Sequence, residues 1–459
     1  MIQPTARPDS SLVRRTCTLL AVAAVALAAS GCGGSSDNAT TTTTFRVRID
    51  NVGKAYPYVK SGAFTTPVGA SAPAPIGPGG AYSFSFTAPR GARLSLATMF
   101  VPSNDFFYAP DEAGIALYDA GGAPVSGDVT AQIRLWDAGT EANQEPGLGA
   151  DQVQRQSAPN TGAIDPNRNV RAAPDTFGNL PPVASVIRVT ITPGANSSFT
   201  VRIDNVSTAT TLATSNGARQ AVPLSPGAWV VHTAAGPLFT TGAPDRGKGL
   251  EAIAEDGAAS ALAASLAADT GITVPLSPGV WALHTANDPL YTFGQIDRNK
   301  GLEQIAEDGD PTQLAASLQG QVGVMASAAF NTPVGAAAPA PIGPGGAYEF
   351  TVRASPGQRL SLATMFVPSN DLFFGPTGQG IALFQSNGAP FSGDATTALM
   401  LIDAGTEVNQ EPGVGTDQVQ RQSAANTGPS ESRPIGLVSD GFSYPATSSV
   451  IRLTITPVP

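Results

Sequence analysis

The sequence predicts an all-β fold: two tandem antiparallel β-sandwich domains, the second carrying a duplicated 52-residue unit that contains short helices. Three observations lead to this prediction. Gly and Pro are abundant, at 50 and 40 of 459 residues, while charged residues make up only 13%; this composition suits short strands joined by tight turns. Short segments show partial alternation of apolar and polar residues, as half-buried strands do. Long segments of the chain also recur almost unchanged.

The N-terminal segment indicates export and tethering. Arginines precede a short apolar run, Leu19–Ala29, which is followed by small residues and Cys32. This order is typical of a secretory signal, and the run is shorter than the ~20 residues that a membrane span needs. We predict a lipoprotein signal peptide over 1–32 with Cys32 lipidated, then a flexible Ser/Thr tether over 33–44. The residue after the cysteine is Gly, as in outer-membrane lipoproteins, so the expected location is the outer membrane or cell surface. Plain secretion with an incidental cysteine is the alternative.

Internal repeats set the predicted domain boundaries. FRVRIDNV, which begins at Phe45, returns as FTVRIDNV 154 residues later. SLATMFVPSND, which begins at Ser95, returns without a changed letter 266 residues later. One sandwich is therefore expected over 45–195, and its copy over 196–459.

The strands of the first copy are short segments separated by turns rich in Gly, Pro and Asn. Six of them are predicted, at 46–52, 81–88, 93–101, 114–120, 128–138 and 185–193. Several strands in about 150 residues, without a helical pattern, favour an antiparallel β-sandwich.

The second copy is expected to carry an insertion that is itself doubled. The two repeat offsets differ by 112 residues, and two units of 52 residues fill most of this difference. Leu250 with Ile253, and Leu262 with Leu266, have helical spacing, so each unit is predicted to hold a strand, a loop and two short helices. The insertion should span about 222–325, and the first sandwich is expected to lack it.

The charge balance argues against one class of function. The formal net charge is −10. A basic groove for nucleic acid is therefore not expected. An acidic surface suits cations and an extracytoplasmic setting.

The segments that both copies keep unchanged place carboxylates in loops after strands. PSND ends one predicted strand, and DAGTE follows another with two carboxylates around a Gly. Ca²⁺ takes about six to eight oxygen ligands, which two loops at one end of a sandwich can supply. The candidate ligands are Asp105, Asp137 and Glu141 in the first copy, and Asp371, Asp403 and Glu407 in the second. The alternative is that the PSND aspartate caps a turn and the DAGTE acids are solvated.

The same two motifs resemble the spondin N-terminal domain. They read PSNDFF at 102–107 with LWDAGTE at 135–141, and PSNDLF at 368–373 with LIDAGTE at 401–407. The resemblance implies an eight-stranded β-sandwich with a calcium ion near one end, and adhesion to a matrix or cell surface. It implies calcium ligation by the aspartates of both motifs; spacing alone adds Glu141 and Glu407. The cysteines of animal members are absent, and Trp136 of the first copy is Ile402 in the second.

These observations lead to three hypotheses of function. The first is an envelope-anchored, calcium-binding surface module that adheres to an unidentified surface or matrix ligand. The second is a structural spacer without a ligand. The third is a hydrolase that uses His232 and His284, which lie near carboxylates in the doubled unit. The sequence shows no nucleophile elbow, HExxH motif or phosphate loop, so we expect no enzyme.

Overall fold

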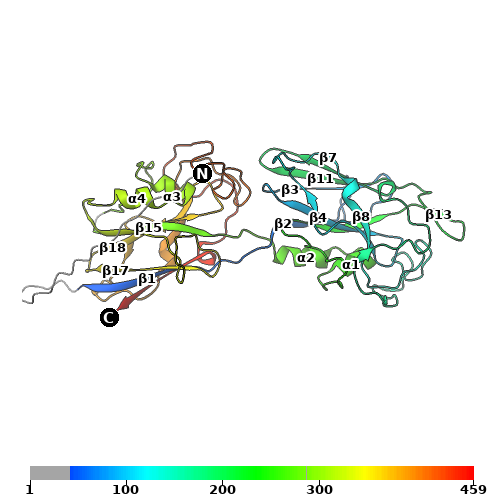
Figure 1. Cartoon of the computed structure of the whole chain (residues 1–459), viewed down its shortest axis with the longest axis horizontal. Helices are drawn as coiled ribbons and strands as arrows, with labels where there is room; N and C mark the ends of the chain where they lie inside the picture. Colours follow the sequence, from blue (N-terminus) through cyan, green and yellow to red (C-terminus); the bar gives the residue numbers. More distant parts are fainter. Residues whose placement is uncertain (1–41, 286) are drawn as a thin grey trace, which may run out of the picture. The chain divides into compact units, whose positions relative to one another are not determined.

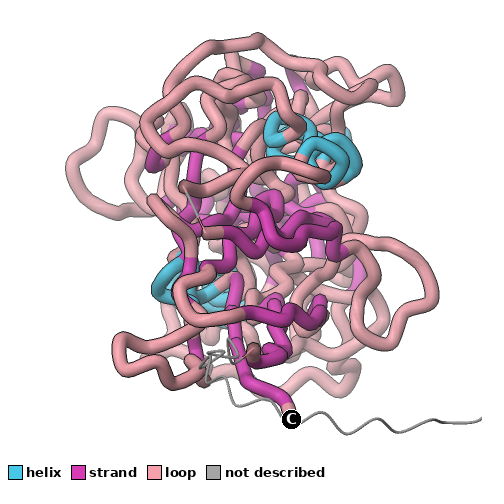
Figure 2. Tube along the Cα trace, turned by 90° about the vertical axis from the view of Figure 1, so that its left-hand side faces the viewer, coloured by secondary structure: helices cyan, strands magenta, loops and turns pink. Residues whose placement is uncertain are grey.

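The computed structural model describes residues 42–285 and 287–459. The predicted signal peptide, Cys32 and residues 33–41 of the predicted tether lie outside these residues, whereas Thr43 and Thr44, which are also part of the predicted tether, begin strand β1 (Thr43–Asn51). The described chain is mostly strand and loop with few helical turns, as Figure 2 shows. The strands form several antiparallel sheets, which confirms the predicted all-β, sandwich-like class.

The first sandwich, residues 58–270, has two sheets. The smaller sheet has the order β3 (Ala81–Thr87), β11 (Ser198–Asn205), β10 (Ile187–Pro193) and β7 (Gly127–Asp128). The larger has the order β2 (Tyr58–Phe64), β14 (Leu224–His232), β4 (Arg93–Phe100), β5 (Phe106–Pro110), β8 (Ile133–Asp137) and β9 (Arg171–Ala172), with β6 (Ile115–Ala116) also on β4. A two-stranded ribbon joins β12 (Leu212–Ala213) to β13 (Arg219–Gln220).

The second sandwich, residues 43–51 with 274–459, repeats this plan. Its smaller sheet has the order β17 (Ala347–Ala354), β1 (Thr43–Asn51), β24 (Ile451–Val458) and β21 (Gly393–Asp394). Its larger sheet has the order β16 (Val324–Phe330), β15 (Leu276–His284), β18 (Arg359–Phe366), β19 (Leu372–Pro376), β22 (Leu399–Asp403) and β23 (Gly436–Leu437), with β20 (Ile381–Ala382) on β18.

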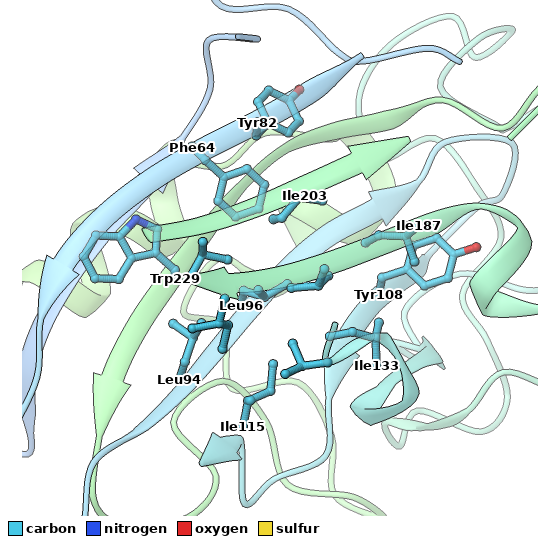
Figure 3. Close-up of a cluster of buried hydrophobic side chains, with 14 of the residues drawn as sticks. Phe64, Tyr82, Leu94, Leu96, Tyr108, Ile115, Ile133, Ile187, Ile203 and Trp229 are labelled. Atoms are coloured by element: carbon cyan, nitrogen blue, oxygen red, sulfur yellow. The ribbon is translucent and has the colours of Figure 1, made fainter. Parts of the chain in front are cut away.

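Each sandwich buries one apolar core between its two sheets. In the first, Leu96 and Trp229 of the larger sheet belong to one cluster with Val189 and Ile203 of the smaller sheet. Figure 3 shows part of this core. Burying each such side chain stabilises the folded state by roughly 1.5–3 kcal/mol. This gain explains why apolar residues alternate with polar ones along the strands.

Short helices cover the other face of each larger sheet. They are α1 (Leu250–Asp256) and α2 (Ser260–Ala268) in the first sandwich, and α3 (Leu302–Asp308) and α4 (Thr312–Ser317) in the second. The predicted helical pairs are buried there: Leu250, Ile253, Leu262 and Leu266 pack in one cluster with Val230.

The two sandwiches are built from other segments of the chain than the predicted domain boundaries imply. Strand β1 pairs with β17 and β24, near the end of the chain, as Figure 1 shows for β1 and β17. Strand β14 of the first 52-residue unit pairs with β2 and β4. The division into 45–195 and 196–459, with both units in the second part, is therefore corrected. Each sandwich contains one 52-residue unit, so the first sandwich does not lack it.

A tight hairpin gives the physical reason for this allocation. Strands β10 and β11 are joined by a turn in which Asn196 and Ser197 have φ of 53° and 57°, and the Gly194 amide donates to the Ser198 carbonyl at 2.8 Å. Two central residues with positive φ match the twist of a two-residue hairpin, and short loops cost little closure entropy. Strand β11 therefore pairs locally, and its near-identical copy β1 takes the equivalent place in the second sandwich.

Candidate metal centre

Two neighbouring strands bring the first two carboxylates together in the second sandwich. Asp371 directly precedes β19 and Asp403 ends β22. These strands pair so that Leu372 lies opposite Asp403, and the Ala404 amide donates to the Asp371 carbonyl at 3.1 Å. The unchanged PSND and DAGTE segments therefore meet at one end of the larger sheet.

A third carboxylate reaches the same place from the long loop before β23. The Glu431 amide donates to the Thr406 carbonyl at 2.8 Å, which fixes this loop against DAGTE. One carboxylate oxygen from each of Asp371, Asp403 and Glu431 lies within 4.8 Å of the others. Asp371 and Asp403 are buried and Glu431 is half-buried, so this acidic triad could hold a metal ion.

One oxygen of the triad is buried without a hydrogen-bond partner. Asp371 Oδ2 accepts from the amides of Thr406 at 2.8 Å and Glu407 at 3.1 Å. Asp371 Oδ1 has no partner, and the residue is 0% exposed. Leaving a buried acceptor unpaired is costly. The two amides therefore hold Oδ2, and Oδ1 is the oxygen of Asp371 without a hydrogen-bond partner.

Two carboxyls of the triad have a raised pKa. Burial, with the nearby charges of Asp403 and Glu431, raises the pKa of Asp371 to about 7. Burial also raises the pKa of Glu431, against the opposing charge of Arg433. A bound cation would offset both the desolvation and the repulsion.

The first sandwich repeats the frame around Asp105 and Asp137. The Thr140 amide donates to Asp105 Oδ2 at 2.8 Å, and the Gly139 amide donates to Asp137 Oδ1 at 2.7 Å. Asp105 Oδ1 is again buried and unpaired. The third carboxylate is Asp165, but here the Arg171 guanidinium lies between Asp137 and Asp165.

The two predicted glutamates bind the neighbouring loops. Asn104 donates to Glu141 Oε2 at 3.3 Å, and the Gly162 amide donates to Oε1 at 2.8 Å. In the second sandwich Asn370 donates to Glu407 Oε2 at 3.3 Å. Among the described residues the metal-sized acidic group contains Glu431 rather than Glu407. These glutamates hold the PSND loop to the loops that follow DAGTE.

Sequence reasoning missed Asp165 and Glu431. They lie 266 residues apart, the same offset as the unchanged motifs, in AIDPNR and PSESRP. The surrounding letters differ completely, so a comparison of unchanged strings passes over them. A comparison of carboxylate positions alone would have found them.

Hydrogen bonding explains much of the unchanged sequence. Ser369 Oγ donates to the Phe366 carbonyl at 2.6 Å and accepts from the Leu372 amide. Gln418 Oε1 accepts from the Gly413 amide at 3.1 Å, and its Nε2 donates to the Glu411 carbonyl at 2.8 Å. Identity between the copies is thus partly a consequence of loop structure, which is why the unpaired Asp371 oxygen is the stronger indication of a ligand.

The two histidines are buried in the larger sheets. His232 Nε2 lies 2.9 Å from Ser95 Oγ, and His284 Nε2 lies 3.0 Å from Ser361 Oγ. Ser361 donates to Asp288 Oδ2 at 2.6 Å. The serine therefore stands between histidine and carboxylate, whereas a nucleophilic triad places the histidine in the middle.

Comparison of the chain with protein-family models and with curated proteins finds no match to either. Within residues 42–285 and 287–459, no helix has the length and apolar character needed to span a membrane.

Proposed function

We propose that this protein is an envelope-anchored surface module whose second sandwich binds a calcium ion through Asp371, Asp403 and Glu431. The observation that carries the metal site is Asp371 Oδ1, a buried oxygen without a hydrogen-bond partner beside two other carboxylates. A bound cation gives this oxygen its missing partner and balances the buried charge.

The donor set favours a hard cation. The triad offers carboxylate oxygens only, and no histidine or cysteine belongs to it. Softer metals such as Zn²⁺ prefer nitrogen and sulfur ligands, whereas oxygen ligands suit Ca²⁺ and Mg²⁺. Mg²⁺ demands near-ideal octahedral geometry, and Ca²⁺ tolerates irregular loops completed by carbonyls and water. Calcium therefore fits a triad assembled from two strand ends and a long loop.

The role at the cell surface rests on sequence. The N-terminal signal and tether support anchoring through Cys32, and the resemblance to the spondin N-terminal domain supports adhesion or partner binding. The proposed partner is a surface or matrix ligand. A spacer without a ligand is the alternative, and it predicts no response to calcium.

The metal site is tested by thermal unfolding of residues 42–459 with and without calcium. We expect calcium at ten times its Kd to stabilise the folded protein by about 1.4 kcal/mol. Asp403→Asn should abolish this gain, because it removes one carboxylate from the triad. The absence of any calcium-dependent shift in the wild-type protein would favour the spacer.

Asp310→Asn is the matched control. Asp310 is exposed and accepts from the Thr312 amide at 2.9 Å before α4. The amide oxygen of asparagine can accept the same hydrogen bond, so this variant loses one negative charge without touching the triad. It should keep the full calcium response.

A further inference from the structure

We propose that the Arg171 guanidinium takes the place of the metal ion in the first sandwich, so that of these two equivalent sites the one in the second sandwich binds an ion. This inference rests on the proposed calcium site, and it explains why the two copies of that site should differ in calcium binding.

The two sites share one frame. The equivalent carboxylates are Asp105, Asp137 and Asp165 in the first sandwich, and Asp371, Asp403 and Glu431 in the second. Matching amides fix them: those of Thr140 and Thr406 each donate at 2.8 Å to the first carboxylate. The amides of Asp165 and Glu431 each donate to the carbonyl of the same threonine, at 3.3 Å and 2.8 Å. The difference between the sites therefore comes from what lies among the carboxylates.

Arg171 binds the oxygens that an ion would need. Its Nη2 donates to Asp137 Oδ2 at 2.5 Å and to Asp165 Oδ2 at 2.6 Å. Its Nη1 donates to the carbonyls of Asn167 at 2.5 Å and Asn169 at 3.2 Å. Two carboxylates and two carbonyls are the kinds of ligand that Ca²⁺ takes from a protein. A fixed positive charge thus already occupies an all-oxygen environment.

The second sandwich has a glycine where Arg171 stands. Arg171 lies opposite Asp137 in the sheet register, and Gly436 lies opposite Asp403. Arg433 makes an ion pair with the third carboxylate: its Nη1 lies 3.4 Å from Glu431 Oε1, and its side chain is 49% exposed. Its ion pair is with Glu431, and no Lys or Arg among the described residues makes an ion pair with Asp371 or Asp403; Asp403 accepts hydrogen bonds from the Gly405 amide and Asn409 Nδ2.

Asp105 does not restore the first site. Its Oδ1 remains buried and unpaired, since Arg171 contacts the other two carboxylates. Arg171 already engages one oxygen of Asp137 and one of Asp165, so too few carboxylate oxygens remain for a cation that takes about six to eight ligands. The positive charge of Arg171 would also repel an incoming ion.

The test is calorimetric titration of residues 42–459 with calcium chloride. The wild-type protein should bind one ion and the Asp403→Asn variant none. Arg171→Gly, which gives the first sandwich the residue of the second, should raise the number of bound ions to two. Arg171→Gly with Asp403→Asn should bind one ion, in the first sandwich.

A reciprocal variant covers the case in which Arg171→Gly fails to fold. Gly436→Arg has room, because a Cβ at this position would meet only the Pro434 carbonyl, at 3.6 Å. It should abolish calcium binding while the protein stays folded. Three results would overturn the role of Arg171 but not the calcium site: two ions bound by the wild type, one ion bound by folded Arg171→Gly, or unchanged calcium binding by Gly436→Arg. No ion in the wild type would overturn the proposed calcium site as well.

Discussion

Glu255 is a buried carboxyl without an obvious structural reason. It lies on α1, it is 2% exposed, and both of its oxygens lack a hydrogen-bond partner. Burial raises its pKa to about 8, assisted by the nearby charges of Glu141, Glu251 and Asp105. Glu307 repeats this on α3, with a pKa also raised to about 8. Each helix therefore carries a carboxyl that is protonated in the folded protein at neutral pH.

This carboxyl should make stability fall with rising pH. The folded pKa of Glu255 lies above its ordinary value of 4.5, so the folded state binds the proton more tightly than the unfolded state does. The stabilisation is complete below pH 4.5 and is lost as the pH rises through about 8. The free energy of unfolding of the wild type should fall between pH 5 and 9. In Glu255→Gln, whose side chain cannot ionise, this fall should be smaller by about 1–3 kcal/mol.

Chemical denaturation in EDTA at several pH values measures this difference. EDTA keeps calcium out of the comparison. Asp310→Asn is a suitable control, since Asp310 is exposed and is not among the charges that raise the pKa of Glu255. Parallel pH profiles for Glu255→Gln and the wild type would show that the carboxyl ionises normally in the folded state.

At the scale of single elements, β1 decides how the chain is divided. Its last residue, Asn51, is buried, and its Nδ2 donates to the carbonyls of Val274 at 2.8 Å and Ile342 at 3.0 Å. Asn205 ends β11 and makes the matching contacts with Ile76 and Val222, both at 2.8 Å. The same motif thus joins the small and large sheets in each sandwich.

Asn51→Ala should destabilise the second sandwich, which contains the C-terminus, and leave the first unaffected. It removes both buried Asn51 hydrogen bonds and leaves the Val274 carbonyl without this donor, while the Ile342 carbonyl keeps the Leu276 amide, so we expect a loss of about 2–3 kcal/mol. Hydrogen exchange read by mass spectrometry locates the loss. Asn205→Ala is the matched variant and should affect the first sandwich. Faster exchange in 58–270 caused by Asn51→Ala would mean that β1 belongs to the first sandwich after all.

Strand content was predictable from the sequence, but the grouping of strands was not. The expected strand at 93–101 is β4, Arg93–Phe100, because a run such as RLSLATMF satisfies the pattern of a buried strand by itself. The repeats FRVRIDNV and FTVRIDNV cannot reveal which sandwich each completes, since they fit either place equally well. That choice depends on the turn at Asn196 and Ser197. Glu431 escaped prediction because the letters around it share nothing with those around Asp165, so a search for unchanged strings passes over it.

At the scale of the whole molecule, the first sandwich is an insertion within the second. Residues 58–270 contain every strand of the first sandwich. The second sandwich needs β1, which lies between β17 and β24 and buries Phe45, Val47 and Ile49 completely. Without β1, two neighbouring strands would lose their partner and about 1.5–3 kcal/mol would be lost for each of the three side chains.

Separate fragments should therefore behave differently. Residues 58–270 should unfold cooperatively on their own, whereas residues 274–459 should not be stably folded. Fusing 43–51 to the C-terminal end of 274–459 through a flexible linker should restore cooperative unfolding. Circular dichroism during heating measures all three. A cooperative transition for 274–459 alone, at the same temperature as for the fused form, would contradict the placement of β1.

The most direct test of the calcium site is a crystal structure of residues 42–459 grown with calcium, with anomalous scattering recorded at a long wavelength. We predict one anomalous peak within coordination distance of Asp371, Asp403 and Glu431, and none beside Arg171. Asp371 Oδ1 should be among the ligands. A map without a peak at these three carboxylates, in crystals soaked at a saturating calcium concentration, would contradict the proposed site.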